Sequence, residues 1–138
     1  MLCRAIEGAG RPDSLVVHVG AHDFVVMNRY PYNPGHIMIA PRRHVATLHD
    51  ATAEELTEMM SLARRAEEAF REVYKPDGMN IGMNLGRPAG AGVADHIHLH
   101  AVPRWIGDTN FMPIIGDTKV ISQALEALYD LLREELSG

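Results

Sequence analysis

The sequence predicts a single α+β domain with a five-stranded antiparallel sheet, one long helix and one C-terminal helix. Five short segments are rich in β-branched or alternating apolar residues, and two longer segments carry apolar residues at helical spacing. Only one of the two helices lies between strands, so an antiparallel sheet is favoured over parallel βαβ winding. The chain has 138 residues, which is the length of one domain covering residues 1–138.

Three strands are expected in the N-terminal third of the chain. Residues 15–19 and 24–27 are short and apolar, and the glycine-containing turn between them predicts a hairpin. The segment 28–35 holds two prolines and ends on a glycine, which favours a fixed loop. A third strand is expected at residues 36–40, where the following proline ends it.

The longest helix is expected at residues 52–74. Thr52 and Glu55 have the spacing of a capping box, and the proline and glycine within residues 76–78 end the helix. The expected apolar stripe consists of Leu56, Met59, Met60, Ala63, Ala66, Phe70 and Val73.

The C-terminal half of the chain supplies the remaining elements. A strand is expected at residues 80–83, and a loop of glycine and alanine at 86–92 leads to a fifth strand that contains three histidines. The second helix, at residues 119–136, packs one apolar stripe on the core. That stripe consists of Ile121, Leu125, Leu128, Leu132 and Leu136.

Composition excludes several classes of protein. The net charge of -5 argues against nucleic acid as the main partner. No apolar stretch has the length of a membrane span, and the N-terminus lacks the pattern of a secretory signal. Cys3 is the single cysteine, so disulfides and multi-cysteine zinc sites are not expected. We therefore expect a cytoplasmic protein without a membrane partner.

The segment 95–105 is the most informative part of the chain. Histidines alternate there with apolar residues, and successive side chains of a strand point to opposite faces. One face is then formed by His96, His98 and His100, and the other, toward the core, by Ile97, Leu99 and Ala101. Three titratable rings on one face are costly for a structural strand, which indicates a chemical site.

Three kinds of site fit these imidazoles. A zinc ion could bind two of them, with Asp95, His36 or His44 as further ligands, although no second ligand cluster or carboxylate base is evident. Alternatively, a neutral imidazole attacks phosphorus, while its neighbours fix its tautomer and face the developing negative charge. A structural cluster is the third possibility. The residues favour the second reading and leave the other two open.

Two motifs resemble the histidine triad family. The run 96–102, followed by Pro103 and Arg104, resembles the histidine triad itself, and residues 28–41 resemble the nucleotide-binding segment of that family. The motifs occur in the order of the family, and the similarity extends from about residue 15 to residue 136. Loop residues 90–95 and 103–113 are most similar to the bacterial branch related to diadenosine tetraphosphate phosphorylases.

This resemblance implies a homodimer that acts on the α-phosphate of nucleotides. His98 corresponds to the nucleophile that takes up a nucleotidyl group, His96 and His100 flank it, and His36 faces the phosphates and the leaving group. The implied activity is a hydrolase or nucleotidyltransferase that cleaves dinucleoside polyphosphates such as diadenosine tetraphosphate, with water or phosphate as acceptor. Alternatives are a nucleoside phosphoramidate hydrolase, a mononucleotide-binding protein with little turnover, and a zinc hydrolase.

The resemblance also implies where the nucleotide is bound. Asn28 corresponds to the residue that holds the ribose hydroxyls, and Asn84 to an amide near the phosphates of fragile-histidine-triad-like members. Where the family commonly has a serine or threonine this chain has Val93, so backbone N–H groups of the loop are expected to replace the hydroxyl. The expected nucleotide-binding residues are Asn28, Asn84, Gly90, Gly92, Val93 and Trp105. No cofactor held by the protein is expected, although a divalent ion can accompany the nucleotide.

Overall fold

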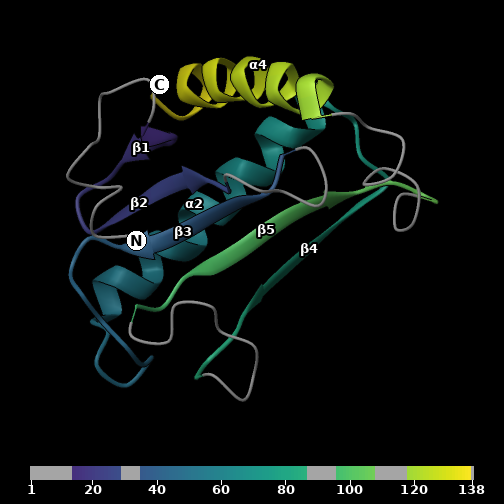
Figure 1. Ribbon diagram of the computed structural model, residues 1–138. Helices are drawn as coiled ribbons and strands as arrows, with labels where there is room; N and C mark the ends of the chain where they lie inside the picture. The colour runs from purple at the N-terminus through teal and green to yellow at the C-terminus, as the bar shows by residue number, and fades with distance from the viewer. Residues whose placement is uncertain (1–13, 29–34, 87–95, 108–117, 138) are drawn as a thin grey trace.

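One antiparallel sheet organises the molecule. The computed structural model in Figure 1 describes residues 14–28, 35–86, 96–107 and 118–137. Within these residues the strands lie in the order β1-β2-β3-β5-β4, and all neighbouring strands run antiparallel. The elements are β1 (Val16–Val19), β2 (Asp23–Met27), β3 (Ile37–Pro41), α2 (Ala53–Val73), β4 (Gly78–Met83), β5 (Leu99–Arg104) and α4 (Thr118–Ser137).

The strand order places β5 between β3 and β4. After β3 the chain crosses the sheet as α2, continues as the edge strand β4 and returns as β5. The predicted α+β class, the N-terminal hairpin and the five antiparallel strands are therefore confirmed. Several strand boundaries differ from the prediction by one or two residues, and β4 begins at Gly78 and not at Asn80. Two further differences concern the site. Pro41 belongs to β3, and β5 begins at Leu99, so that His96 and His98 precede the regular strand.

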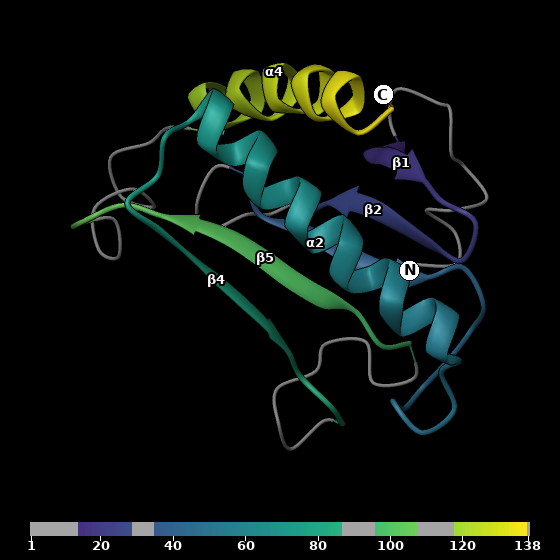
Figure 2. The same ribbon diagram turned by 180° about the vertical axis from the view of Figure 1, so that it is seen from behind.

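Both helices cover the same face of the sheet. Figure 2 shows α2 running diagonally across that face, with α4 beside it near β1, and both helices contact the sheet and each other. Burial of apolar side chains between these layers supplies most of the stability of such a fold. This core includes Val25, Met27, Ile37, Ile39, Met59, Leu62, Ala66, Phe70, Leu99, Ala101, Leu128 and Leu132.

The opposite face of the sheet carries the histidines. Strand alternation directs Leu99 and Ala101 toward the helices and therefore directs His98 and His100 away from them, as the sequence predicts. A second, smaller apolar cluster lies on the histidine face. It consists of Val16, Phe24, Val26, Met38 and Ala40.

Helix α2 begins as predicted. The Thr52 hydroxyl accepts a hydrogen bond from the backbone N–H of Glu55, and the Glu55 carboxylate accepts one from the N–H of Thr52. After the last turn, Lys75 adopts a positive φ of 47°, and its N–H donates to the carbonyl of Phe70. The prediction for Met60 is wrong, because its side chain is 59% exposed.

Gly35 fixes the entrance to β3. Its φ of 91° lies in the left-handed region, which residues with a Cβ rarely adopt. A Cβ at this position would also come within 2.8 Å of Cγ of Pro103 and 3.2 Å of Cε1 of Phe70. Both constraints require glycine immediately before His36.

Within the described residues, neither helix is long and apolar enough to cross a membrane.

An unpaired acid lies under the start of α2. The Asp23 side chain is fully buried, and neither carboxyl oxygen has a hydrogen-bond partner among the residues that the structure describes. Beside it, the Glu58 carboxylate accepts hydrogen bonds from the backbone N–H groups of Ala21, His22 and Asp23. Burial, together with the smaller effects of the Glu58 and Glu55 carboxylates, raises the pKa of Asp23 to about 7. Sequence patterns alone gave no indication of this arrangement.

The buried acid makes stability depend on pH. The unfolded chain releases the Asp23 proton near its ordinary pKa of 3.8, whereas the folded chain holds it until about pH 7. Stability is therefore lost as the pH rises between these values. We expect Asp23→Asn to leave the free energy of unfolding nearly unchanged at pH 4.5 and to increase it by roughly 1–3 kcal/mol at pH 8. Urea denaturation at both pH values measures this difference.

Asp130→Asn is the matched control, since Asp130 is exposed on α4. Equal effects of Asp23→Asn at both pH values would contradict the assignment of a buried titrating acid.

Candidate active site

Two imidazoles join the central strands on the histidine face. His36 immediately precedes β3, and His100 lies on β5 opposite Met38. Nε2 of His36 lies 2.9 Å from Nδ1 of His100, which is a hydrogen bond between the rings. On the other side of His36, the amide Nδ2 of Asn28 lies 3.1 Å from Nδ1. The end of β2, the start of β3 and the middle of β5 thus meet at one cluster.

His98 is held in a defined tautomer. Its Nδ1 lies 3.1 Å from the backbone carbonyl oxygen of His96. Because a carbonyl can only accept, Nδ1 carries the proton of the neutral ring and the lone pair lies on Nε2. The ring packs edge-on against His100, with centroids 4.7 Å apart and planes at 75°. In this geometry Nε2 of His98 is the ring nitrogen that carries no proton.

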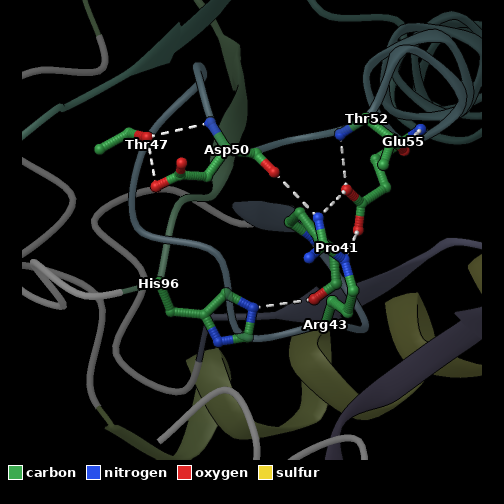
Figure 3. A network of polar contacts seen from close by, with 7 residues as sticks. All are labelled: Pro41, Arg43, Thr47, Asp50, Thr52, Glu55 and His96. Atoms are coloured by element: carbon green, nitrogen blue, oxygen red, sulfur yellow. Dashed lines mark hydrogen bonds and ion pairs between the residues drawn. The ribbon is translucent and has the colours of Figure 1, made fainter.

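His96 connects the cluster to the end of β3. Its side chain is 1% exposed, and Nε2 donates to the carbonyl oxygen of Pro41 at 2.8 Å (Figure 3). The ring of His44 lies beside it with centroids 5.2 Å apart. The N–H of Ile97 donates to the carbonyl of Val45 at 2.7 Å, which extends the contact between these segments. His96 therefore supports the site, while its carbonyl orients His98.

An ion pair fixes the segment that follows Pro41. Figure 3 shows the Arg43 guanidinium on the Glu55 carboxylate, with contacts of 2.8 and 3.1 Å, and on the carbonyl of Asp50 at 2.9 Å. Glu55 also takes part in the capping box with Thr52. The Arg43 hydrogen bonds lower the pKa of Glu55 to about 2. The start of α2 thereby anchors the segment against which His96 packs.

The two bonded imidazoles are neutral at pH 7 in the protein without substrate. Burial, together with the smaller effects of the nearby rings of His100 and His98, lowers the pKa of His36 to about 4. Burial and the ring of His98 also lower the pKa of His100. Each of the two rings therefore carries a single proton, whose position is set by hydrogen bonding.

The structure brings some of the expected site residues together and leaves others apart. Asn28, His36, His98 and His100 form the cluster described above. Asn84 is exposed and follows Met83, the partner of Leu99 at the end of β4, so its backbone lies near the start of β5.

Trp105 lies at the opposite end of β5. It follows His100 by five residues, about 17 Å of extended chain, and packs edge-on against Tyr74 with centroids 6.0 Å apart. The neighbouring Arg104 donates to the side-chain oxygen of Asn80 at 2.7 Å. Gly90, Gly92 and Val93 lie outside the described residues.

Sequence reasoning missed the partners of these histidines. The capping-box spacing indicates Glu55, but nothing in the spacing pairs it with Arg43, and no motif singles out the carbonyl of Pro41. In the described parts of the chain, no three His, Cys, Asp or Glu side chains are placed to hold a metal ion together.

Comparison with known proteins agrees with this fold and site. The HIT domain model matches residues 11–105, and the chain belongs to this family. The chain is 46% identical over 123 residues to the AP-4-A phosphorylase of Mycobacterium tuberculosis H37Rv, and the match covers 89% of this chain. The match spans 63% of that relative, so the chain corresponds to less than two thirds of its length.

Two more distant relatives extend the comparison. The asymmetrical bis(5'-nucleosyl)-tetraphosphatase of Schizosaccharomyces pombe is 36% identical over 78 residues, which cover 56% of this chain and 42% of the relative. The crystal structure of a zinc-bound histidine triad family protein from Mycobacterium smegmatis superposes with a TM-score of 0.75 at 27% identity, covering 99% of this chain and 91% of that one.

The buried contact of His96 predicts a structural role. In His96→Ala the carbonyl of Pro41 loses a buried donor, and a cavity replaces the ring. We expect the free energy of unfolding to fall by roughly 1–3 kcal/mol in urea denaturation. His49→Ala, at an exposed position, is the control and should change stability by less than about 0.5 kcal/mol. An equally small effect of His96→Ala would show that the contact contributes little.

Proposed function

We propose that this protein cleaves dinucleoside polyphosphates of the diadenosine tetraphosphate type at the α-phosphate, as a hydrolase or nucleotidyltransferase. The observation that carries this proposal is the hydrogen bond from Nδ1 of His98 to the His96 carbonyl, because it leaves the lone pair on Nε2. Support also comes from the family match and from the names of the relatives, an AP-4-A phosphorylase and a bis(5'-nucleosyl)-tetraphosphatase.

The proposed reaction has two displacement steps. Nε2 of His98 attacks the α-phosphorus, so that an N–P bond forms while the P–O bond to the leaving polyphosphate breaks. The leaving oxygen keeps the electron pair. Water or inorganic phosphate then attacks the same phosphorus, the N–P bond breaks, and neutral His98 is restored. A nucleotidyl-histidine intermediate replaces one difficult displacement by two easier ones.

His100 and His36 are proposed to stabilise the charge that develops on the phosphate. A bound polyphosphate raises the pKa of imidazoles that face it, so that one of them gains a proton in the complex. A divalent ion that arrives with the nucleotide can neutralise further charge, and no metal or other cofactor held by the protein is required. Asn28, Asn84, Trp105 and the backbone of Gly90, Gly92 and Val93 are proposed nucleotide contacts.

We also propose a homodimer with one domain per chain, residues 1–138, working in the cytoplasm without nucleic acid or membrane. The edge strand β4 supports a second copy as partner, because its outer backbone groups are unpaired within the described sheet and Ile81 and Leu85 are 44% and 45% exposed. The molar mass of the protein in solution decides this point.

The nucleophile is tested with diadenosine tetraphosphate, with and without inorganic phosphate. We expect wild-type protein to release AMP and ATP if water is the acceptor, and ADP and ATP if phosphate is the acceptor. His98→Ala should lose turnover and covalent labelling by radioactive substrate while retaining much of its nucleotide affinity.

Three outcomes would contradict the proposal. A wild-type protein that binds nucleotide without turnover would be a binding protein. Turnover that survives in His98→Ala would exclude this nucleophile. Stoichiometric zinc together with activity lost on chelation would favour a metal-dependent hydrolase.

The pH dependence of the reaction should separate the free protein from its complex. Activity requires a neutral His98 and a protonated imidazole facing the phosphate, which gives bell-shaped profiles. Because the free protein lowers the pKa of His36 and His100 while bound polyphosphate raises them, the alkaline limb of kcat should lie at higher pH than that of kcat/KM. Coincident limbs would show that no imidazole gains a proton on binding.

A further inference from the structure

Asn28 contacts an imidazole directly. Its Nδ2 lies 3.1 Å from Nδ1 of His36, whose Nε2 lies 2.9 Å from Nδ1 of His100. An amide nitrogen only donates, so Nδ1 of His36 accepts and the proton of the neutral ring must lie on Nε2. Nε2 of His36 therefore donates to Nδ1 of His100, which accepts. The single proton of the neutral His100 ring must then lie on Nε2 of that ring. One amide thus determines the tautomer of two rings.

We propose that Asn28 is a positioning residue for catalysis, which through its hydrogen bond to His36 sets the proton-bearing nitrogen of both His36 and His100. The assignment rests on the proposed function for the roles of these two imidazoles. It is separate from a contact of Asn28 with ribose, because it concerns the protein's own rings.

The surroundings of His36 leave the choice of its protonated nitrogen to the hydrogen bond with Asn28. The titratable groups that act on His36 are His100 on β5 and His98 just before it, and both disfavour a second proton on the ring, as burial does. A neutral His36 has two tautomers of similar energy, so a single hydrogen bond at Nδ1 decides between them. The residue at position 28 is also held independently of its side chain, since its backbone N–H donates to the carbonyl of His36 at 2.9 Å.

An amide can also support the opposite arrangement. Rotated by 180°, Asn28 presents Oδ1 to His36, and Nδ1 of His36 then carries the proton. Nε2 of His36 becomes an acceptor, so that His100 can hold protons on both nitrogens. When His100 is the imidazole that gains the proton in the complex, Nε2 of His36 therefore accepts from it, and Oδ1 of Asn28 accepts from His36 in turn. A carboxylate at position 28 only accepts, so it supports this second arrangement and not the first. An apolar side chain at position 28 supports neither arrangement.

The assignment is tested first by observing the protons. In ¹⁵N NMR of histidine-labelled protein at pH 7, we expect wild-type His36 and His100 to be protonated at Nε2. Asn28→Asp should move the His36 proton to Nδ1 and raise the pKa of His36, since a carboxylate accepts from Nδ1 and favours the charged ring. Asn28→Leu should leave His36 as a mixture of tautomers. Asn80→Leu, an asparagine replaced on β4, is the control and should leave both rings unchanged.

Kinetics then separate this role from a ribose contact. With diadenosine tetraphosphate, Asn28→Leu should lower kcat by roughly 10–100-fold with a smaller effect on KM, as expected when a group that orients catalytic side chains is lost. The same loss should persist with an analogue of this substrate that lacks the 2' and 3' hydroxyls. Asn28→Asp should shift the pH profile of kcat/KM in the same direction as the pKa of His36 measured by NMR in this variant.

Two results would overturn the inference. His36 that stays protonated at Nε2 alone in Asn28→Asp would show that the amide does not set the tautomer. A kinetic loss in Asn28→Leu that disappears with the dideoxy analogue would assign Asn28 to the ribose alone. The NMR result does not depend on turnover, so a wild-type protein inactive on diadenosine tetraphosphate would reject the proposed function without deciding the tautomer question.

Discussion

The hydrogen bond between Nε2 of His36 and Nδ1 of His100 is the interaction on which the site depends. It joins two strands that are neighbours only because α2 carries the chain past β3 to the edge strand and β5 returns between them. Antiparallel pairing places Met38 opposite His100, and His36, two residues before Met38, reaches the ring of His100 diagonally. A slip of one residue in the pairing of β5 would turn His100 toward the helices. The chemistry of the site is therefore a consequence of sheet register.

Much of this could be predicted because it follows local rules. Alternation along residues 96–101 is sufficient to separate the imidazoles from the core, and the capping box at Thr52 marks the start of α2 to within one residue. The hairpin of β1 and β2 follows from short apolar segments around a turn. Each of these features is encoded within a few consecutive residues, which is the range over which periodicity and turn chemistry act.

The remaining features depend on residues far apart in the sequence. The donor to Pro41 comes from His96, 55 positions later, and Glu58 binds the turn at Ala21 from 37 positions away. A sequence pattern cannot express such pairings, since the strand order that creates them is itself a tertiary property. Met60 shows the same limit, because its helical spacing fits the apolar stripe while its side chain is exposed in the folded chain. Asp23 has no local signal at all, as its burial results from the helix packed over it.

Gly35 links the interior to the histidine cluster in a mechanical sense. The side chains of Pro103 on β5 and Phe70 on α2 leave no room for a Cβ at this position, and the next residue along the chain is His36. Displacement of the helix toward or away from the sheet would therefore be transmitted through this close approach to an imidazole on the other side. The helices and the histidine face of the sheet therefore cannot shift independently of each other. A core substitution near Phe70 must preserve the alignment of the imidazole rings as well as the volume of the side chain.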